Sequence, residues 1–242
     1  MAIRSIHVAL LPGELENIEA DGHVAVVIDV LRASTTIVKA LANGASQVIP
    51  LDTVEAARNQ QAQEPELLLC GERDAHPLPG FDLGNSPREY TKERVGGKGL
   101  VLTTTNGTRA LQAVEKAGAG TIVVGAFTNR QAVIDFCASS HGPLLLACAG
   151  CQGRFSLEDA LCAGAIIAGL GEGFYLTDAA RACLTLYEHW GLEQLASLVT
   201  ASEHGQRLQR KGYGEDIMVA MAVDTYSVVP IYQDGKIRLE QG

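Results

Sequence analysis

Three short polar segments of this sequence carry side chains that could bind an anion or a metal ion. The first, "DVLRASTT", contains Asp29 and Arg32 and continues into Ser34 and Thr35. A carboxylate that ends an apolar run is costly to bury, so Asp29 should be edge-exposed, paired or metal-bound; capping of the next turn is the alternative. Hydroxyls and free N–H groups at a helix N-terminus bind anions, and Arg32 adds a guanidinium. The segment therefore predicts an anion site.

The second segment, "TTTNGTRAL", has the same character. Thr104, Thr105, Asn106, Gly107 and Thr108 follow an apolar run and open a helical pattern. A glycine allows a ligand to approach the backbone closely. An ordinary polar loop with an Asn-Gly turn would also explain these residues. We predict that the segment contributes to the same anion site.

The third segment, "SLEDAL", brings two adjacent acids, Glu158 and Asp159, to the start of another helix. Together with Asp29 they could hold Mg²⁺, which takes one or two carboxylates plus water and substrate phosphate oxygens. The alternative is a capping box opened by Ser156, with acids that suit the helix dipole, and it is favoured for Asp159. The predicted metal ligands are thus Asp29, Glu158 and Asp159.

The cysteines just before this helix suggest three other chemistries. Cys148 and Arg154 have the spacing of a cysteine-phosphatase loop, and Cys148 and Cys151 form a C-x-x-C pair. Ala147 stands where such a phosphatase loop has His, and nothing marks a thioredoxin-like helix start. Zinc would need two more ligands at close spacing. We therefore disfavour all three chemistries.

The elements that would position these segments alternate between strand and helix. His23–Val30 and Gln47–Leu51 are typical of buried strands, and the helix Ser34–Ala45 lies between them. The order strand, polar turn, helix, strand, helix occurs at about 23–60 and again at 97–136, and a looser third copy begins at Leu144. This order predicts an α/β fold of three layers, α/β/α, with a mostly parallel sheet. The polar turns should gather at the carboxyl edge of that sheet.

The remainder of the chain completes one domain. The segment Cys70–Thr91 is rich in Pro, Gly and charge, and we expect it to be a functional loop. Helices should follow in the C-terminal part, and then a hairpin that turns at Asp234–Gly235. No linker demands a boundary, so residues 1–242 are predicted to form a single domain.

Composition narrows the classes of partner. The net charge of −9 argues against binding a nucleic-acid backbone and leaves a small molecule as the expected partner. No apolar run reaches the roughly 18 residues of a membrane-spanning helix, and no signal peptide is visible. Six scattered cysteines then indicate buried thiols of a cytoplasmic protein. Apolar helices such as Ala179–Trp190 suggest a homodimer.

Six motifs in order resemble the 2-phosphosulfolactate phosphatase family. They are "VVIDVLRASTTIVKALANGA", "CGERDAHPLPGFDLGNSP", "LTTTNGTRAL", "GAFTNRQAV", "ACAGCQGRFSLEDALCAGAI" and "DIMVAMAVDTYSVVPIY", and they span about His23 to Tyr232. The resemblance implies a Mg²⁺-dependent phosphatase of coenzyme M biosynthesis that converts (2R)-2-phospho-3-sulfolactate into sulfolactate and phosphate. It places in the site Asp29, Arg32, Glu72, Arg73, Asn85, Thr104 to Thr108, Glu158, Asp159 and Asp216.

These residues suggest a metal-assisted hydrolysis. Mg²⁺ would be held by Asp29, with Glu158, and would neutralise charge as the ester breaks. Arg32 would hold the phosphoryl oxygens, and Glu72 would orient or deprotonate water. The other expected substrate contacts are Ser34, Thr35, Arg73, Asn85 and the turn Thr104, Thr105, Asn106, Gly107 and Thr108.

Three alternatives remain open. In a covalent mechanism Asp29 would attack phosphorus, although Leu31 stands where an aspartyl phosphatase has its second Asp. The substrate could be another phosphorylated hydroxy acid. The chain could also bind an anion without catalysis.

Overall fold

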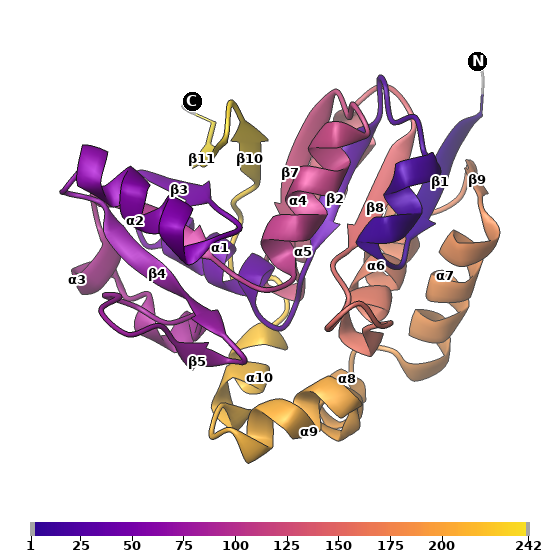
Figure 1. Cartoon of the computed structure of the whole chain (residues 1–242). Coiled ribbons are helices and arrows are strands. Elements are labelled where there is room, and N and C mark those ends of the chain that lie inside the picture. The colour runs from indigo at the N-terminus through magenta and orange to yellow at the C-terminus, as the bar shows by residue number, and fades with distance from the viewer. Residues whose placement is uncertain (1–2, 241–242) are drawn as a thin grey trace.

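The protein is built around one long sheet. The computed structural model describes residues 3–240, and their strands form a single 11-stranded sheet in the order β5-β4-β6-β3-β11-β10-β7-β2-β8-β1-β9. Figure 1 shows this sheet with helices on both sides. The strands are β1 (Arg4–Ala9), β2 (Val24–Ile28), β3 (Gln47–Pro50), β4 (Leu68–Arg73), β5 (His76–Pro77), β6 (Gly99–Thr103), β7 (Thr121–Gly125), β8 (Leu144–Cys148), β9 (Phe174–Leu176), β10 (Pro230–Gln233) and β11 (Lys236–Leu239).

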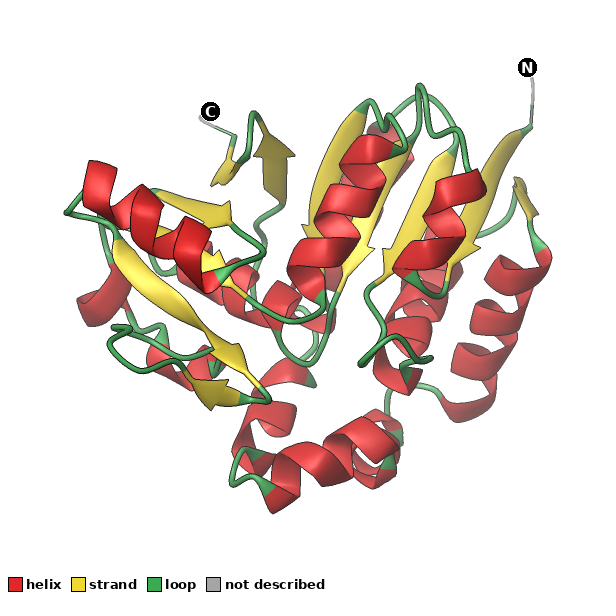
Figure 2. Cartoon of the chain, in the orientation of Figure 1, coloured by secondary structure: helices red, strands yellow, loops and turns green. Residues whose placement is uncertain are grey.

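Ten α-helices and three short 3-10 helices belong to the described residues. The α-helices are α1 (Ala33–Ala42), α2 (Val54–Gln63), α3 (Lys92–Val95), α4 (Gly107–Lys116), α5 (Arg130–Ser139), α6 (Leu157–Leu170), α7 (Asp178–Trp190), α8 (Leu195–Ala201), α9 (Glu203–Arg210) and α10 (Gly214–Ala220). The 3-10 helices are η1 (Pro12–Asn17), η2 (Pro87–Glu89) and η3 (Phe127–Asn129). Figure 2 shows how the helices alternate with strands along most of the chain.

The predicted repeat is present, and its two copies are interlocked. One copy is β2-α1-β3 and the other is β6-α4-β7, with α1 beginning at residue 33 and α4 at residue 107. The strands of one copy are not neighbours: β2 pairs in parallel with β7, and β3 pairs in parallel with β6. Each connecting helix therefore crosses from one parallel block of the sheet to the other.

The two connecting helices, α1 and α4, contact each other at their first residues. A β-carbon added at Gly107, the first residue of α4, would lie 2.7 Å from the β-carbon of Ala33, the first residue of α1. The polar turns that follow β2 and β6 are therefore adjacent although their strands are not. This contact, rather than adjacent strands, brings the first two predicted segments together.

The C-terminal hairpin joins the two blocks of the sheet. β10 and β11 turn at Asp234 and Gly235, as the sequence predicted. β10 is antiparallel to β7, and β11 is antiparallel to β3. The sheet is thus mostly parallel within each block and antiparallel only at the hairpin and at β5.

Both faces of the sheet are covered, which confirms the three-layer α/β/α architecture. Val24, Val26 and Ile28 of β2 pack in a core with α5, α6 and α7, whereas Ala25 and Val27 face a second core with α1 and α4. A smaller core lies under α2. A strand buried on both faces explains the unbroken apolar run in the sequence.

The C-terminal helices α8, α9 and α10 lie across the carboxyl ends of the strands, at the bottom of Figure 1. The predicted C-terminal helices include α8 and α9, which are separated at Ser202, whose Oγ accepts the amide of Gly205 at 3.0 Å and so caps α9. The apolar side of α7 packs against the core around α6, and the predicted homodimer stays a prediction. Within residues 3–240, no helix is long and apolar enough to cross a membrane.

Candidate active site

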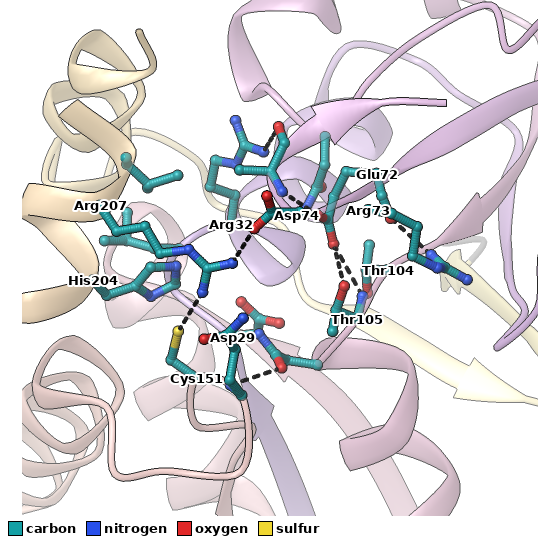
Figure 3. Close-up of a pocket in the computed structure, with 16 residues that line it drawn as sticks. Asp29, Arg32, Glu72, Arg73, Asp74, Thr104, Thr105, Cys151, His204 and Arg207 are labelled. Carbon is teal, nitrogen blue, oxygen red and sulfur yellow. Dashed lines mark hydrogen bonds and ion pairs between the residues drawn. The ribbon is translucent and has the colours of Figure 1, made fainter. Parts of the chain in front are cut away.

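The three predicted polar turns meet at one cavity of about 220 Å³. The turn after β2 contributes Asp29 and Arg32, the turn after β6 contributes Thr104, Thr105 and Asn106, and the loop after β8 contributes Cys151 and Gln152. The β4–β5 region and α9 close the other sides, with Glu72, Arg73, Asp74, Asn85, His204 and Arg207 among the lining residues. Figure 3 shows these side chains around the cavity.

Asp29 lies at the crossing point of the two repeat copies. Its backbone N–H donates to the hydroxyl of Ser34 at 2.9 Å, and its Oδ1 accepts the amide of Ala33 at 3.3 Å. Its Oδ2 lies where a β-carbon on Gly107 would be only 2.9 Å away. Burial raises the pKa of Asp29 to about 6, and His204 opposes this rise. Asp29 therefore caps α1 with one oxygen and keeps the other at the start of α4.

Arg32 is held by the protein itself. The Leu31–Arg32 peptide bond is cis, and the guanidinium is only 3 % exposed. It donates to Asp216 Oδ2 at 2.7 Å and to the carbonyl of Ala75 at 2.9 Å, and it stacks over the ring of Tyr213 at 4.4 Å. Asp216 is fully buried. This network ties α10 to the turn after β2, so much of the hydrogen-bonding capacity of Arg32 is already used.

Arg73 is also committed to partners in the protein. Its guanidinium donates to the carbonyls of Glu72 and Asp52 at 2.7 and 2.9 Å and to the hydroxyl of Thr103 at 2.9 Å. In Figure 3 the Arg73 side chain extends away from the centre of the cavity. Its predicted substrate contact gains no support from this placement.

Glu72 joins two walls of the cavity. Its Oε1 accepts the backbone N–H and the hydroxyl of Thr105 at 3.0 and 2.9 Å, and its Oε2 accepts the amide of Ala75 at 2.7 Å. These three bonds fix the turn after β6 against the β4–β5 region. Asn85 also lines the cavity, and its Oδ1 is buried without a hydrogen-bond partner among the described residues.

Several predicted substrate-binding residues stabilise the turns through hydrogen bonds without lining the cavity themselves. Ser34 and Thr35 donate their hydroxyls to the carbonyls of Val27 and Val30, at 3.3 and 2.8 Å. Thr108 contacts the hydroxyl of Thr104 at 3.3 Å. Ser34, Thr35, Gly107 and Thr108 do not line the main cavity, whereas Thr104, Thr105 and Asn106 do. Within this turn, only Thr104, Thr105 and Asn106 can therefore contact a molecule bound in the cavity.

The two predicted metal ligands of α6 have separate environments. Asp159 Oδ1 accepts the amide of Val30 at 2.8 Å, and its Oδ2 accepts the amide of Gly150 at 3.1 Å. Asp159 therefore joins the turns after β2 and β8 rather than capping its own helix, and Ser156 makes no side-chain cap either.

Glu158 forms a buried pair with a residue that the sequence analysis missed. Its Oε1 lies 2.6 Å from Nδ1 of His204, and its Oε2 is buried without a hydrogen-bond partner among the described residues. Burial alone lowers the pKa of His204, but Cys151 and Glu158 outweigh burial and raise this pKa to about 10. Burial alone raises the pKa of Glu158, and His204 outweighs it and lowers this pKa. The pair is therefore charged at neutral pH.

A second missed group lies at the mouth of the cavity. Arg207 of α9 donates to Oδ1 of Asp74 at 2.5 Å, and Lys211 pairs with the same carboxylate. Nothing in the local sequence distinguishes these cations from an ordinary solvated helix face.

The thiols are not arranged for chemistry. Cys148 is buried in β8, and burial raises its pKa well above the ordinary range. All six cysteines are free thiols, and all except the half-buried Cys151 are buried, much as the sequence indicated. A protonated, buried Cys148 is a poor nucleophile. The structure thus agrees with disfavouring the phosphatase-loop and redox alternatives.

Comparison with known proteins identifies the family. The sequence model of the 2-phosphosulpholactate phosphatase family matches residues 9–235. The chain belongs to this family. It is 44% identical over 218 residues to a probable 2-phosphosulfolactate phosphatase of Thermotoga maritima, covering 90% of this chain and 92% of that protein. A protein of the same name from a Synechococcus species is 43% identical over 215 residues, covering 85% and 87%. The predicted family is confirmed, and with it the enzyme class, phosphoric monoester hydrolase.

Proposed function

We propose that the cavity hydrolyses (2R)-2-phospho-3-sulfolactate to (2R)-3-sulfolactate and phosphate with the help of Mg²⁺. The relatives' names supply the substrate. The observation that supports the proposal best is the meeting of Asp29 with the turn after β6 at one small cavity. A carboxylate oxygen beside the N-terminus of α4 places a possible metal ligand next to free backbone N–H groups, which suits the binding of a phosphoryl group.

The phosphate would sit against the turn after β6. The first amide of α4 that donates within the helix is that of Ala110, to the carbonyl of Asn106, and Asn106 makes no side-chain cap. The backbone N–H of Asn106, at the part of this helix start that lines the cavity, is therefore a candidate to hold a phosphoryl oxygen, with the hydroxyl of Thr104 beside it. Glu72 keeps this turn in place through its bonds to Thr105.

The donor set suits Mg²⁺ if Asp29 is its principal protein ligand. Asp29 lines the cavity, and its Oδ2 makes no hydrogen bond among the described residues. Glu158 Oε2 is also without a partner there, but Glu158 does not line this cavity, and both oxygens of Asp159 accept amides. No group of three or more His, Cys, Asp and Glu side chains within residues 3–240 is arranged to hold a metal ion. Mg²⁺ usually binds through one or two carboxylates, water and substrate phosphate. Bound there, it would neutralise charge on the phosphoryl group.

The roles of the remaining residues follow from their contacts. Arg32 acts as a positioning residue that fixes the turn bearing Asp29. His204 lines the cavity, and its raised pKa keeps it protonated against the Glu158 carboxylate, so it acts mainly by positioning that carboxylate. Glu72 remains our candidate to orient water, and its three hydrogen bonds make positioning of the Thr105 turn its other contribution.

The test is phosphate release from racemic 2-phospho-3-sulfolactate, beside 2-phospholactate and phosphoglycolate. We expect release to stop at about half of the racemic substrate, to require Mg²⁺ and to be slower on the other two esters. Equal rates on all three would point instead to a phosphatase of general hydroxy-acid phosphates. No release from any of them by folded protein would indicate an anion-binding protein without this activity.

The covalent alternative has a separate test. If Asp29 attacked phosphorus, ³²P-labelled substrate would leave label on quenched protein, and the label would disappear in Asp29→Asn. We expect no label, because Oδ1 of Asp29 is engaged with the amide of Ala33 and Oδ2 is the proposed metal ligand.

A further inference from the structure

The cations around the cavity differ in how firmly the protein holds them. Arg32 is buried against Asp216, Ala75 and Tyr213, and Arg73 donates three hydrogen bonds to acceptors of the protein. Arg207 instead pairs with Asp74, whose side chain is 65 % exposed. Its other contact is a weak one of 3.9 Å from Nη1 to the Sγ of Cys151. Arg207 is thus the lining arginine that an incoming anion can most easily engage.

Asp74 occupies the position that such an anion would take. It sits at the tip of the β4–β5 turn with φ of 54°, and its two oxygens face Arg207 of α9 and Lys211, the residue that follows α9. Arg207 contacts one oxygen and Lys211 the other, and Lys211 also donates to the carbonyl of Asp74 at 2.8 Å. These two cations hold the pKa of Asp74 down at about 2. Two cations that converge on one exposed carboxylate form a ready-made receptor for an oxyanion.

The position of Arg207 in the cavity determines which group of the substrate can reach it. In Figure 3 Arg207 enters the cavity from α9, opposite Thr104 and Thr105. With the phosphate at the turn after β6, the group nearest Arg207 is the one farthest from the phosphate. In 2-phospho-3-sulfolactate the phosphate and the carboxylate are on the same carbon, and the sulfonate is on the next carbon. The sulfonate therefore reaches farthest across the cavity.

We propose that Arg207, assisted by Lys211, binds the sulfonate of the substrate, and that the Asp74 carboxylate occupies this receptor in the free protein. This inference rests on the proposed function for its choice of ligand. Substrate binding then exchanges one anion for another at Arg207, so the cost of displacing Asp74 is partly offset by an equivalent ion pair. Arg207 becomes the residue that distinguishes sulfonated from unsulfonated hydroxy-acid phosphates.

The test compares Arg207→Gln with wild type on 2-phospho-3-sulfolactate and on 2-phospholactate, which lacks the sulfonate. We expect kcat/KM for the sulfonated substrate to fall roughly 10- to 100-fold, mainly through KM, because a charge-assisted hydrogen bond is lost. The value for 2-phospholactate should change less than about threefold. Arg207→Lys should restore part of the difference. Arg210→Gln, on the same helix and with the same charge change, is the matched control, because Arg210 does not line the cavity that contains Asp29.

Asp74→Asn should change the KM for the sulfonated substrate in the opposite direction. Removing the competing carboxylate frees Arg207, so KM for the sulfonated substrate should fall roughly threefold to tenfold while KM for 2-phospholactate stays the same. A purely structural link between α9 and the β4–β5 turn predicts the reverse, a rise of KM for both substrates. Either that rise or an equal loss on both substrates in Arg207→Gln would overturn the inference.

Binding of 3-sulfolactate and lactate, measured by calorimetry, separates this inference from the proposed function. If Arg207→Gln binds 3-sulfolactate more weakly than wild type does, but binds lactate equally well, the result supports the sulfonate receptor. This holds even if the wild type releases no phosphate. Turnover of the sulfonated substrate with no selective effect of Arg207→Gln leaves the proposed function standing and removes the receptor. Absence of both turnover and 3-sulfolactate binding would remove both.

Discussion

The buried ion pair between Arg32 and Asp216 should make the protein sensitive to the loss of either partner. The guanidinium and the carboxylate are 2.7 Å apart and are 3 % and 0 % exposed. Asp216→Asn would leave the Arg32 charge buried without a counterion. Breaking one partner of such a pair costs about 3 to 5 kcal/mol, against a total stability of about 5 to 15 kcal/mol for a typical domain. At about 2 to 4 °C per kcal/mol, the melting temperature should fall by roughly 6 to 20 °C.

The neighbouring residue provides a matched control. Glu215 pairs with Arg88 on the surface, where the two side chains are 73 % and 51 % exposed. Glu215→Gln removes the same charge one residue away on the same helix and should change stability by about 0.5 kcal/mol or less. Urea unfolding followed by circular dichroism measures both variants, and a double-mutant cycle with Arg32→Met measures the coupling of Arg32 to Asp216. If Asp216→Asn costs no more than Glu215→Gln, our account of Arg32 as a positioning residue is wrong.

Three further predictions concern the cavity and the core. Burial raises the pKa of Asp29 from 3.8 to about 6, so between these pH values the folded protein binds more protons than the unfolded chain. Without metal, the free energy of unfolding should therefore fall as pH rises from about 4 to 6, and Asp29→Asn should flatten this dependence. The apparent Mg²⁺ affinity should weaken about tenfold per pH unit below about 6, and an affinity that does not change with pH would contradict this. Gly107→Ala places a β-carbon 2.7 Å from the β-carbon of Ala33 and 2.9 Å from Asp29 Oδ2, so it should lower the free energy of unfolding by about 1 to 3 kcal/mol and also lower kcat. The control is Gly13→Ala, whose added β-carbon meets nothing within 4 Å and which should change neither the stability nor kcat. Cys148→Ala should keep kcat/KM within about twofold, and a loss beyond about tenfold would revive thiol chemistry.

The sequence predicted the parts of this site that local pattern controls. The apolar runs, the polar turns after them and the helix starts repeat at 33 and 107, so Asp29 and the Thr104–Asn106 turn could be assigned to one site. Strand partners could not be assigned, because β2 joins β7 and β3 joins β6 through pairings between distant residues. The two turns meet through the crossing of α1 and α4, which no local pattern reveals.

The residues that were misjudged or missed depend on contacts that are distant in sequence. Arg32 lines the cavity, and its expected contact with phosphate stays a prediction, but its pairing with Asp216, 184 residues away, could not be foreseen. Asp159 looked like a helix cap or a metal ligand, and it instead accepts the amide of Val30, 129 residues away. His204 and Arg207 lie on a polar surface helix, and only the docking of that helix over the sheet edge gives them a place in the cavity. The cytoplasmic location also stays a prediction.

The most direct measurement is phosphate release from racemic 2-phospho-3-sulfolactate by wild type and Asp29→Asn, each titrated with Mg²⁺ from an EDTA-treated start. Our account predicts that wild type is inactive without Mg²⁺, saturates with it and stops at about half of the substrate, and that Asp29→Asn loses at least about 100-fold in kcat/KM while binding Mg²⁺ more weakly. Full activity of the wild type in EDTA, or of Asp29→Asn at any Mg²⁺ concentration, would contradict the placement of the chemistry at Asp29.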